Sequence, residues 1–154
     1  MKLMKKVAGL ILSGVLCLTM LAGCGSNGGK SSGSSDGDKL KVGIIQMIEN
    51  GAFNDMREGF IDELAEKGYG EDKVEFVYKC AQGDATNLQT IAQSMADGSY
   101  DLVCTIATPP TQAMVNLNSD TPVVFVSVSA PVEAGILTSM EKPDKNATGT
   151  SNAI

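Results

Sequence analysis

Histidine and tryptophan are absent from the 154-residue sequence, and aromatic residues make up only 5% of it. The missing histidine removes the most common general base and the most common metal ligand of proteins. Basic residues are also few, at 12 against 18 acidic ones, and they form no cluster of the kind that binds nucleic acid. The composition therefore argues against nucleic acid as a partner and against histidine-based catalysis or metal binding.

Motifs of common enzyme classes are missing as well. The sequence has no Gly-x-Ser-x-Gly nucleophile motif, and its Cys, Asp and Glu residues form no tight metal-binding group. A receiver domain would place an aspartate at the end of its third strand, where Ala107 and Thr108 stand. We therefore expect a protein that is not an enzyme and has no cofactor and no metal site. An enzyme on a flavodoxin-like sheet is the less favoured alternative.

The N-terminus has the features of a bacterial export signal. Three lysines and no acidic residue lie within Met1–Lys6, and the almost wholly apolar residues 7–20 are fewer than the about 20 that span a bilayer. Leu-Ala-Gly-Cys follows at residues 21–24 and matches the lipobox, in which the cysteine thiol accepts a diacylglyceryl group. We expect residues 1–23 to be a signal peptide and Cys24 to be the lipidated mature N-terminus. Loss of the three leader lysines would change the net charge from −6 to −9.

The segment after Cys24 differs sharply from the rest of the chain. Residues 24–38 contain mainly Gly, Ser, Asp and Asn, which have little apolar surface to bury, so they predict a flexible tether. No strand precedes these glycines and no Gly-Lys-Ser/Thr ending follows, which argues against a phosphate-binding loop. About 115 residues remain beyond the tether, enough for one modest domain.

Apolar runs and helical periodicities alternate along this domain, which spans residues 39–146. Strands followed by helices at short spacing predict parallel βαβ units in an open, doubly wound α/β sheet. We expect strand order 2-1-3-4, with a fifth strand that is either small or completed by further chain. The expected strands are 40–47, 74–78, 101–107 and 122–128, the expected helices are 53–67, one from Asp84 to Gly98, one starting at Thr108, and one near 132–141, and residues 147–154 look extended.

Two cysteines, Cys80 and Cys104, lie within this domain. In the expected strand order they lie on the two strands that flank the first strand, about 10 Å apart. A disulfide requires Cα atoms within about 7 Å. Both cysteines are therefore predicted to be free thiols despite export.

Ligands of such sheets bind outside the carboxyl ends of the strands. The sharpest candidate there is Thr108-Pro-Pro-Thr-Gln112, a helix start whose unpaired N–H groups and dipole would attract a carboxylate or phosphate. The prolines have no N–H, which leaves the backbone of Thr111 and Gln112 and the threonine hydroxyls as donors. An ordinary N-capped helix start is the alternative, with Thr108 as the cap.

Further candidates follow the other strands. Gln46, Glu49 and Asn50 end the first strand and have side chains suited to a ligand amide or amine, although Glu49 is equally suited to capping the next helix or to exposure. Ser127 and Ser129 end the fourth strand, where loop residues without a ligand role are the alternative. Asn152 lies in the expected crossover, as a ligand contact or part of a hinge.

Several segments in order resemble a known family from Leu40 to the last residue. The chain resembles ABC-transporter substrate-binding lipoproteins with the type I periplasmic-binding-protein fold, whose members have two lobes joined by crossing strands. The matching segments are residues 41–50, 57–61, 81–84, 106–109, 122–125, 131–135 and 148–151.

This resemblance implies a function and a partner. It implies an extracytoplasmic, membrane-anchored protein that passes a small molecule, favoured as an aromatic amino acid, to an ABC permease with its ATPase. A lipoprotein sensor that presents ligand to a membrane receptor or kinase has the same features. Ala130 and Asn152 stand where the family often has aspartate, so an ammonium-binding carboxylate expected there is missing. Residues 147–154 correspond to the start of the crossover to a second lobe.

Overall fold

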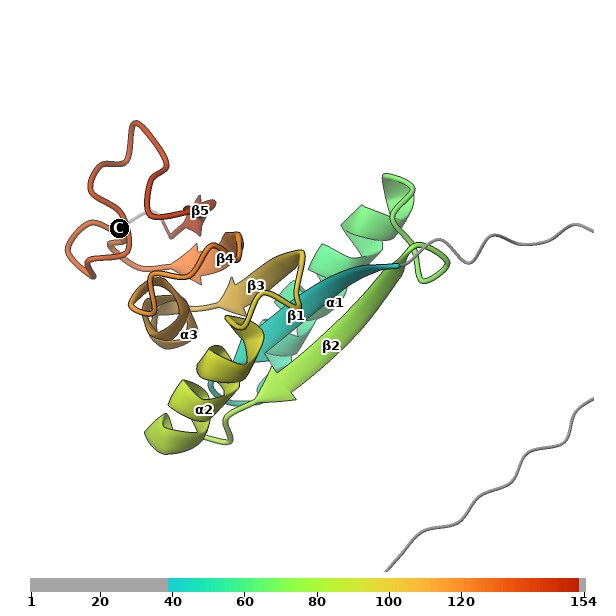
Figure 1. The fold of residues 1–154 in the computed structure, drawn as a ribbon, viewed down its shortest axis with the longest axis horizontal. Helices are drawn as coiled ribbons and strands as arrows, with labels where there is room; N and C mark the ends of the chain where they lie inside the picture. The colour runs from blue at the N-terminus through green and yellow to red at the C-terminus, as the bar shows by residue number, and fades with distance from the viewer. Residues whose placement is uncertain (1–38, 153–154) are drawn as a thin grey trace, which may run out of the picture. The chain divides into compact units, whose positions relative to one another are not determined.

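Strands and helices alternate through residues 39–152, which are the residues that the computed structural model describes (Figure 1). The predicted signal peptide, the tether and Cys24 lie outside the described residues. The elements are β1 (Leu40–Gln46), α1 (Gly51–Glu66), β2 (Val74–Cys80), α2 (Ala85–Met95), β3 (Leu102–Ile106), α3 (Thr108–Val115), β4 (Val123–Val128) and β5 (Ala147–Ser151).

The five strands form one parallel sheet in the order β2-β1-β3-β4-β5. The predicted α/β class and the order 2-1-3-4 are therefore confirmed, and the fifth strand is a short edge strand beside β4. Ile44 on β1 pairs with Tyr78 on β2 and with Cys104 on β3, which fixes the register across the middle of the sheet. Both cysteines are free thiols, as the strand order predicts, because β1 separates their strands.

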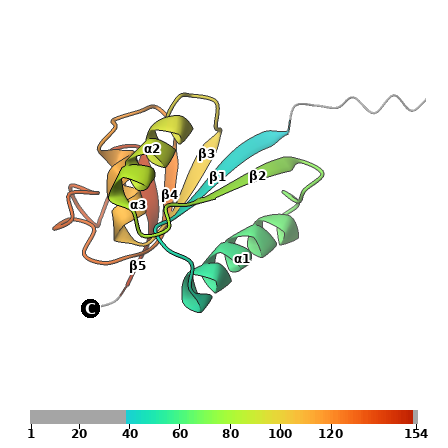
Figure 2. The same cartoon turned by 90° about the horizontal axis from the view of Figure 1, so that it is seen from below.

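Helices cover both faces of the sheet (Figure 2). Helix α1 covers one face, where Phe53, Met56 and Phe60 pack against Ile44 and neighbouring residues of β3. Helices α2 and α3 cover the other face. The core there contains these fully buried side chains: Ile45, Met95, Val103, Met114, Phe125 and Ile136.

Local rules account for two helix starts. Asn50 and Asp84 precede α1 and α2 in extended conformation, and their side chains accept from Phe53 N and Asn87 N at 2.8 and 2.7 Å. The expected start at Asp84 is confirmed, whereas α1 begins two residues earlier than expected and α2 ends before Gly98.

The helix expected near 132–141 is wrong, because this segment consists of turns and bends. A single helical turn from Ala130 stops at Gly135, whose φ of +71° is outside the helical region. The N–H groups of Ile136 and Leu137 then both bond to Pro131 O, and both side chains are buried in the sheet's core. Tertiary burial thus overrides the helical pattern here.

Candidate functional site

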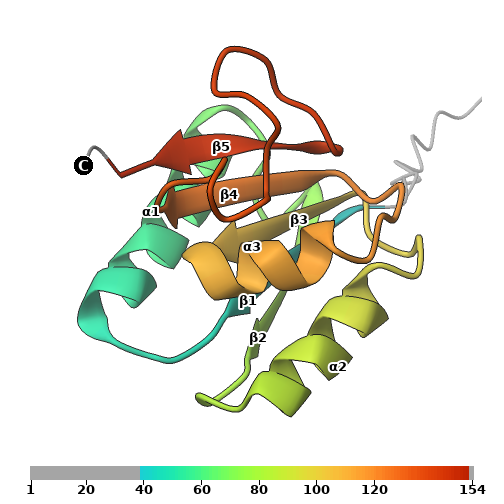
Figure 3. The same ribbon diagram turned by 90° about the vertical axis from the view of Figure 1, so that its left-hand side faces the viewer.

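The carboxyl ends of the inner strands lie side by side at one edge of the sheet (Figure 3). Gln46 at the end of β1 pairs with Cys80 at the end of β2 and with Ile106 at the end of β3, and Ile106 pairs with Val126. The loops that carry the predicted ligand residues therefore all begin at this carboxyl edge.

Four of the predicted residues are brought together there by hydrogen bonds. Ser127 Oγ donates to Asn152 Oδ1 at 2.8 Å, and Asn152 Nδ2 donates to Ser129 Oγ at 3.4 Å. The backbone N–H of Ser129 in turn donates to Thr108 Oγ1 at 3.1 Å. These residues come from β4, the loop after it, α3 and the residue after β5, and we call them the hydroxyl cluster: Thr108, Ser127, Ser129 and Asn152.

The direction of these bonds determines what the hydroxyl cluster offers to a ligand. Thr108 Oγ1 and Ser129 Oγ act as acceptors in the bonds above, so each retains its own hydroxyl hydrogen for another partner. Asn152 retains its second amide hydrogen, and its oxygen accepts from Ser127. The cluster therefore keeps three side-chain hydrogens, on Thr108, Ser129 and Asn152, beside the free lone pairs of its oxygens, and these hydrogens can be donated to a carboxylate or another anionic group.

Three residues at the same edge have left-handed backbone conformations. Ala107, Ser127 and Ala130 have φ angles of +73°, +60° and +45°, which residues with a Cβ rarely adopt. Ser127 lies where the β4–β5 register shifts, between the pairs formed by Phe125 and Val128. Such conformations cost on the order of 1–3 kcal/mol each and are typical of ligand-binding loops.

Helix α3 begins differently from the expectation. Ala107 is its N-cap residue and Thr108 is its first helical residue, so Thr108 is not the cap and makes no capping bond. Gln112 lies four residues after Thr108, so its predicted free N–H is used within the helix, on the Thr108 carbonyl. Pro109 and the next proline have no N–H, which leaves the N–H of Thr108 at this helix start.

The Thr111 side chain, predicted as a ligand group, lies inside the protein. It is fully buried, and its Oγ1 donates to Ala107 O at 2.8 Å. Thr105 Oγ1 lies 2.8 Å from Thr111 Oγ1, and the Thr105 side chain is also fully buried. Because the single hydroxyl hydrogen of Thr111 goes to Ala107, Thr105 must donate to Thr111.

Gln112 lies on the loop side of α3. Its Nε2 donates to Ala134 O at 2.8 Å and so ties the helix to the turn segment after β4. The side chain is half-buried, and its Oε1 remains the part available to another group.

The predicted residues after β1 form a separate group next to α1. Gln46 is fully buried and both of its N–H bonds are internal, to Ile48 O at 3.3 Å and Asn54 Oδ1 at 3.2 Å. Asn50 Oδ1 is used as the cap of α1. Glu49 is exposed and accepts from Tyr78 Oη at 3.3 Å.

The sequence pattern did not select Arg57 and Tyr78, which complete this group. The Arg57 guanidinium lies over the Tyr78 ring at 4.4 Å from its centroid, and Arg57 Nη1 donates to Gln46 Oε1 at 3.1 Å. Burial, with smaller effects of Cys80 and Glu49, raises the pKa of Tyr78 to about 12, so its hydroxyl stays protonated. The sequence signal for this group is an arginine within the helix that directly follows the first apolar strand.

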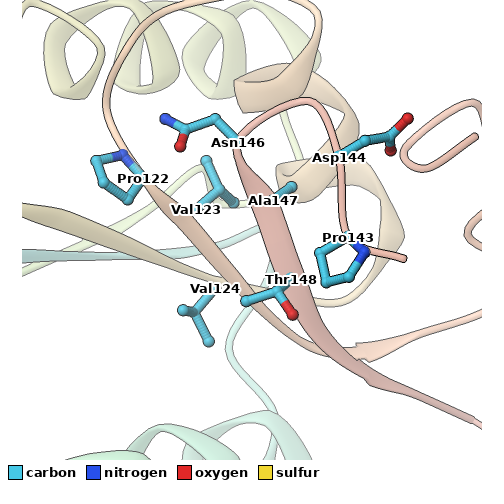
Figure 4. Close-up of a pocket in the computed structure, with 8 residues that line it drawn as sticks. All are labelled: Pro122, Val123, Val124, Pro143, Asp144, Asn146, Ala147 and Thr148. Atoms are coloured by element: carbon cyan, nitrogen blue, oxygen red, sulfur yellow. The ribbon is translucent and has the colours of Figure 1, made fainter. Parts of the chain in front are cut away.

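A hollow of about 270 Å³ lies at the other end of β4 and β5 (Figure 4). Its walls come from the amino-terminal ends of these strands and from residues 143–146, and Asp144 on its rim accepts from Thr138 N at 3.0 Å. None of the predicted ligand residues lines it.

A membrane-crossing helix and a metal site are both absent from the part of the chain that the structure describes. No helix within residues 39–152 is long and apolar enough to cross a membrane. The same residues hold no group of three or more Cys, Asp or Glu side chains placed to bind a metal ion.

Comparison with known proteins identifies relatives of this arrangement. The sequence profile of ABC transporter substrate binding proteins matches residues 41–154. A tyrosine-binding protein of Clostridioides difficile (strain R20291) is 38% identical over 156 residues, which cover 97% of this chain and 45% of the relative.

Solved structures agree with this match. The structure of an ABC domain in complex with L-Trp from Streptococcus pneumonia has a TM-score of 0.70 at 30% identity, over 73% of this chain and 38% of that one. A ligand-free, open substrate binding protein with adhesive properties from Clostridium difficile has a TM-score of 0.71 at 35% identity, over 75% of this chain and 39% of that one. The chain thus spans less than half the length of each of these relatives.

Proposed function

This chain belongs to the family of ABC transporter substrate-binding proteins, and we propose that its residues 39–146 form one ligand-binding lobe of a two-lobed importer component. In this proposal residues 147–154 begin the crossover to the second lobe. The ligand is an amino acid, and its partner is an ABC permease with its ATPase. Family membership points to a binding role rather than to catalysis.

The hydroxyl cluster is the observation that carries the ligand class. Its unspent hydrogens, on Thr108, Ser129 and Asn152, lie at the carboxyl edge with the Thr108 N–H, and a carboxylate is an acceptor for such donors. A hydrogen bond to a charged group contributes about 1.5–3 kcal/mol. Gln112, Glu49 and Asn50 border this edge as further proposed contacts, whereas Gln46 and Thr111 act through bonds inside the lobe.

An aromatic side chain on the ligand is supported by two relatives. One is described as a tyrosine-binding protein and the other was solved with L-Trp. Both are more than 25% identical to this chain over most of its described residues. We therefore include aromatic amino acids as the favoured ligands.

The proposed location is outside the cell membrane, held there by lipid on Cys24. The basic head, the apolar run and the Leu-Ala-Gly-Cys sequence support this anchor. Acyl chains add about 0.8 kcal/mol of membrane affinity per buried CH₂ group, enough for several chains to hold the protein at the surface.

Calorimetry with a panel of amino acids tests the proposal. The two-lobed protein should bind at least one member of the panel, and Ser129→Ala should weaken binding about tenfold through loss of one charge-assisted bond. Ser119→Ala, at the amino-terminal end of the sheet, is the matched control and should bind like the wild type. Uptake of the bound amino acid should stop when the gene is deleted, if the protein serves an importer.

The isolated chain provides a second arm. A tight site usually covers about 70–90% of a small ligand. One lobe leaves the hydroxyl cluster open to water, so residues 25–154 alone should bind weakly or not at all. Micromolar binding by this fragment would contradict the two-lobed proposal, and equal binding by the Ser129→Ala variant would place the site elsewhere.

A further inference from the structure

The loop between β1 and α1, residues 47–50, is tied down at every position. Each of its four residues accepts at least one hydrogen bond from a group outside the loop, and these bonds restrain the loop in the ligand-free protein. The bonds run from Gly83 N to Met47 O (2.8 Å), from Gln46 Nε2 to Ile48 O (3.3 Å), from Tyr78 Oη to Glu49 Oε1 (3.3 Å) and from Phe53 N to Asn50 Oδ1 (2.8 Å).

Arg57 contacts two of the groups that make these bonds. Its Nη1 donates to Gln46 Oε1 at 3.1 Å and to Asn54 Oδ1 at 3.4 Å. Its guanidinium also lies over the ring of Tyr78, 4.4 Å from the centroid. Both the Gln46 amide and the Tyr78 hydroxyl are therefore held in place by the same side chain.

Packing alone does not account for a charged residue at position 57. Its side chain is only 18% exposed, and its carboxylate contact, to Glu58, is long at 3.5 Å on a side chain that is 64% exposed. Enclosing a cation without a close counter-charge costs free energy that a methionine or leucine would not incur. The planar guanidinium does, however, match both an amide oxygen and an aromatic face at once.

We propose that Arg57 is a positioning residue for ligand binding, which fixes the β1–α1 loop through Gln46 and Tyr78. This inference rests on the proposed function, because the loop it fixes borders the carboxyl edge where the ligand is placed. Arg57 does not contact the ligand in this proposal. Its effect on affinity comes from preorganising residues 47–50.

Hydrogen exchange of the ligand-free protein tests the structural half of the proposal. Arg57→Met should speed amide exchange at Gly83 and Phe53, whose N–H groups donate to Met47 O and Asn50 Oδ1, while the core of β3 and β4 stays protected. Lys41→Met is the matched control, because Lys41 lies 4.5 Å over the Tyr100 ring at the opposite end of β1. It removes the same kind of contact and should leave exchange at these two amides unchanged. Equal exchange of both amides in the wild type and Arg57→Met would overturn the proposal.

Ligand affinity tests the functional half in the two-lobed protein. Ordering a side chain or loop on binding costs about 0.5–1.5 kcal/mol per immobilised group, so Arg57→Met should weaken binding about three- to tenfold, mainly through faster dissociation. Arg57→Lys should not restore affinity, because an ammonium lacks the planar fork. Tyr78→Phe keeps the stack and loses only the Glu49 bond, so its effect should be smaller.

The two possible failures are distinguishable. If the wild-type protein binds no amino acid, the proposed function fails while the exchange experiment still reports on Arg57. If the wild type binds and Arg57→Met binds equally well, the positioning role is wrong and the proposed function stands. If Arg57→Met unfolds, Arg57→Lys replaces it: an ammonium lacks the planar fork, so exchange at Gly83 and Phe53 should rise in the same way.

Discussion

The buried pair Thr105–Thr111 gives a prediction about stability at a position that the sequence selected for ligand binding. Thr105 donates to Thr111, which donates to Ala107 O, and both side chains are fully buried. Valine has nearly the shape of threonine and a similar helix propensity, so substitution isolates the hydroxyl.

The two single variants should lower the free energy of unfolding by different amounts. Thr111→Val leaves the Thr105 hydroxyl buried with no acceptor, which costs about 1–3 kcal/mol in addition to the lost bond to Ala107. Thr105→Val removes one bond, worth about 1 kcal/mol, and leaves the Thr111 donor satisfied. The double variant should cost less than the sum, because no unpaired hydroxyl remains.

Equilibrium urea unfolding of the four proteins measures this cycle. Thr90→Val is the matched control, because Thr90 Oγ1 donates to the carbonyl four residues earlier at 2.9 Å, as Thr111 does, but on an exposed helix face. It should cost under about 0.5 kcal/mol, as surface substitutions usually do. Thr111→Val should also keep the wild-type ligand affinity within about twofold at temperatures well below unfolding, a difference of less than about 0.5 kcal/mol. Unchanged stability with lost affinity would show that the hydroxyl reaches the ligand and would refute this reasoning.

Three further predictions concern other parts of the chain. Metabolic labelling with a palmitate analogue should mark the wild type and not Cys24→Ser, and equal labelling would end the lipoprotein proposal. A Cβ at Gly149 would fall on the carbonyl oxygen of Phe125, so Gly149→Ala should lower the free energy of unfolding in urea by about 3 kcal/mol or more. Gly59 lies in open space on α1, so Gly59→Ala should raise it by about 1 kcal/mol. Burial raises the pKa of Cys104 from its ordinary 9.0 to about 12, so stability should fall as the pH rises above 9.0, because the unfolded chain loses this proton first. If Cys104→Ala loses as much stability above pH 9.0 as the wild type does, the prediction is wrong.

The strands were predictable because their sequences are nearly continuous apolar runs, which sheets buried on both faces require. The order 2-1-3-4 followed from short βαβ connections, and the α2 cap followed from the local preference of Asp84. The segment 132–141 was not predictable in this way. Its backbone is fixed by distant groups, since Ile136 and Leu137 are buried against the sheet and Asp144 bonds back to Thr138.

The positions of the candidate residues in the fold were predictable, but the bonds among them were not. Parallel strands bring the loops to one edge, where Thr108, Ser127, Ser129 and Asn152 are joined by hydrogen bonds; their role in ligand binding stays a prediction. Which hydroxyls remain free depends on where α3 begins. The positive φ of Ala107 makes Thr108 the first helical residue, and one helical turn later Thr111 turns toward the core. No local rule places a capping alanine with a positive φ at that point.

The unspent groups of the hydroxyl cluster also limit what this lobe contributes to specificity. Donors that fit a carboxylate bind the part that all amino acids share, so they raise affinity for every amino acid alike. Ala130 and Asn152 carry no charge, and Asp84 is used as a helix cap, so these positions supply no free carboxylate for an ammonium group. If the proposed function holds, we therefore expect a preference for an aromatic side chain to come mainly from the second lobe. A preference that survived in residues 25–154 alone would place those surfaces on this lobe instead.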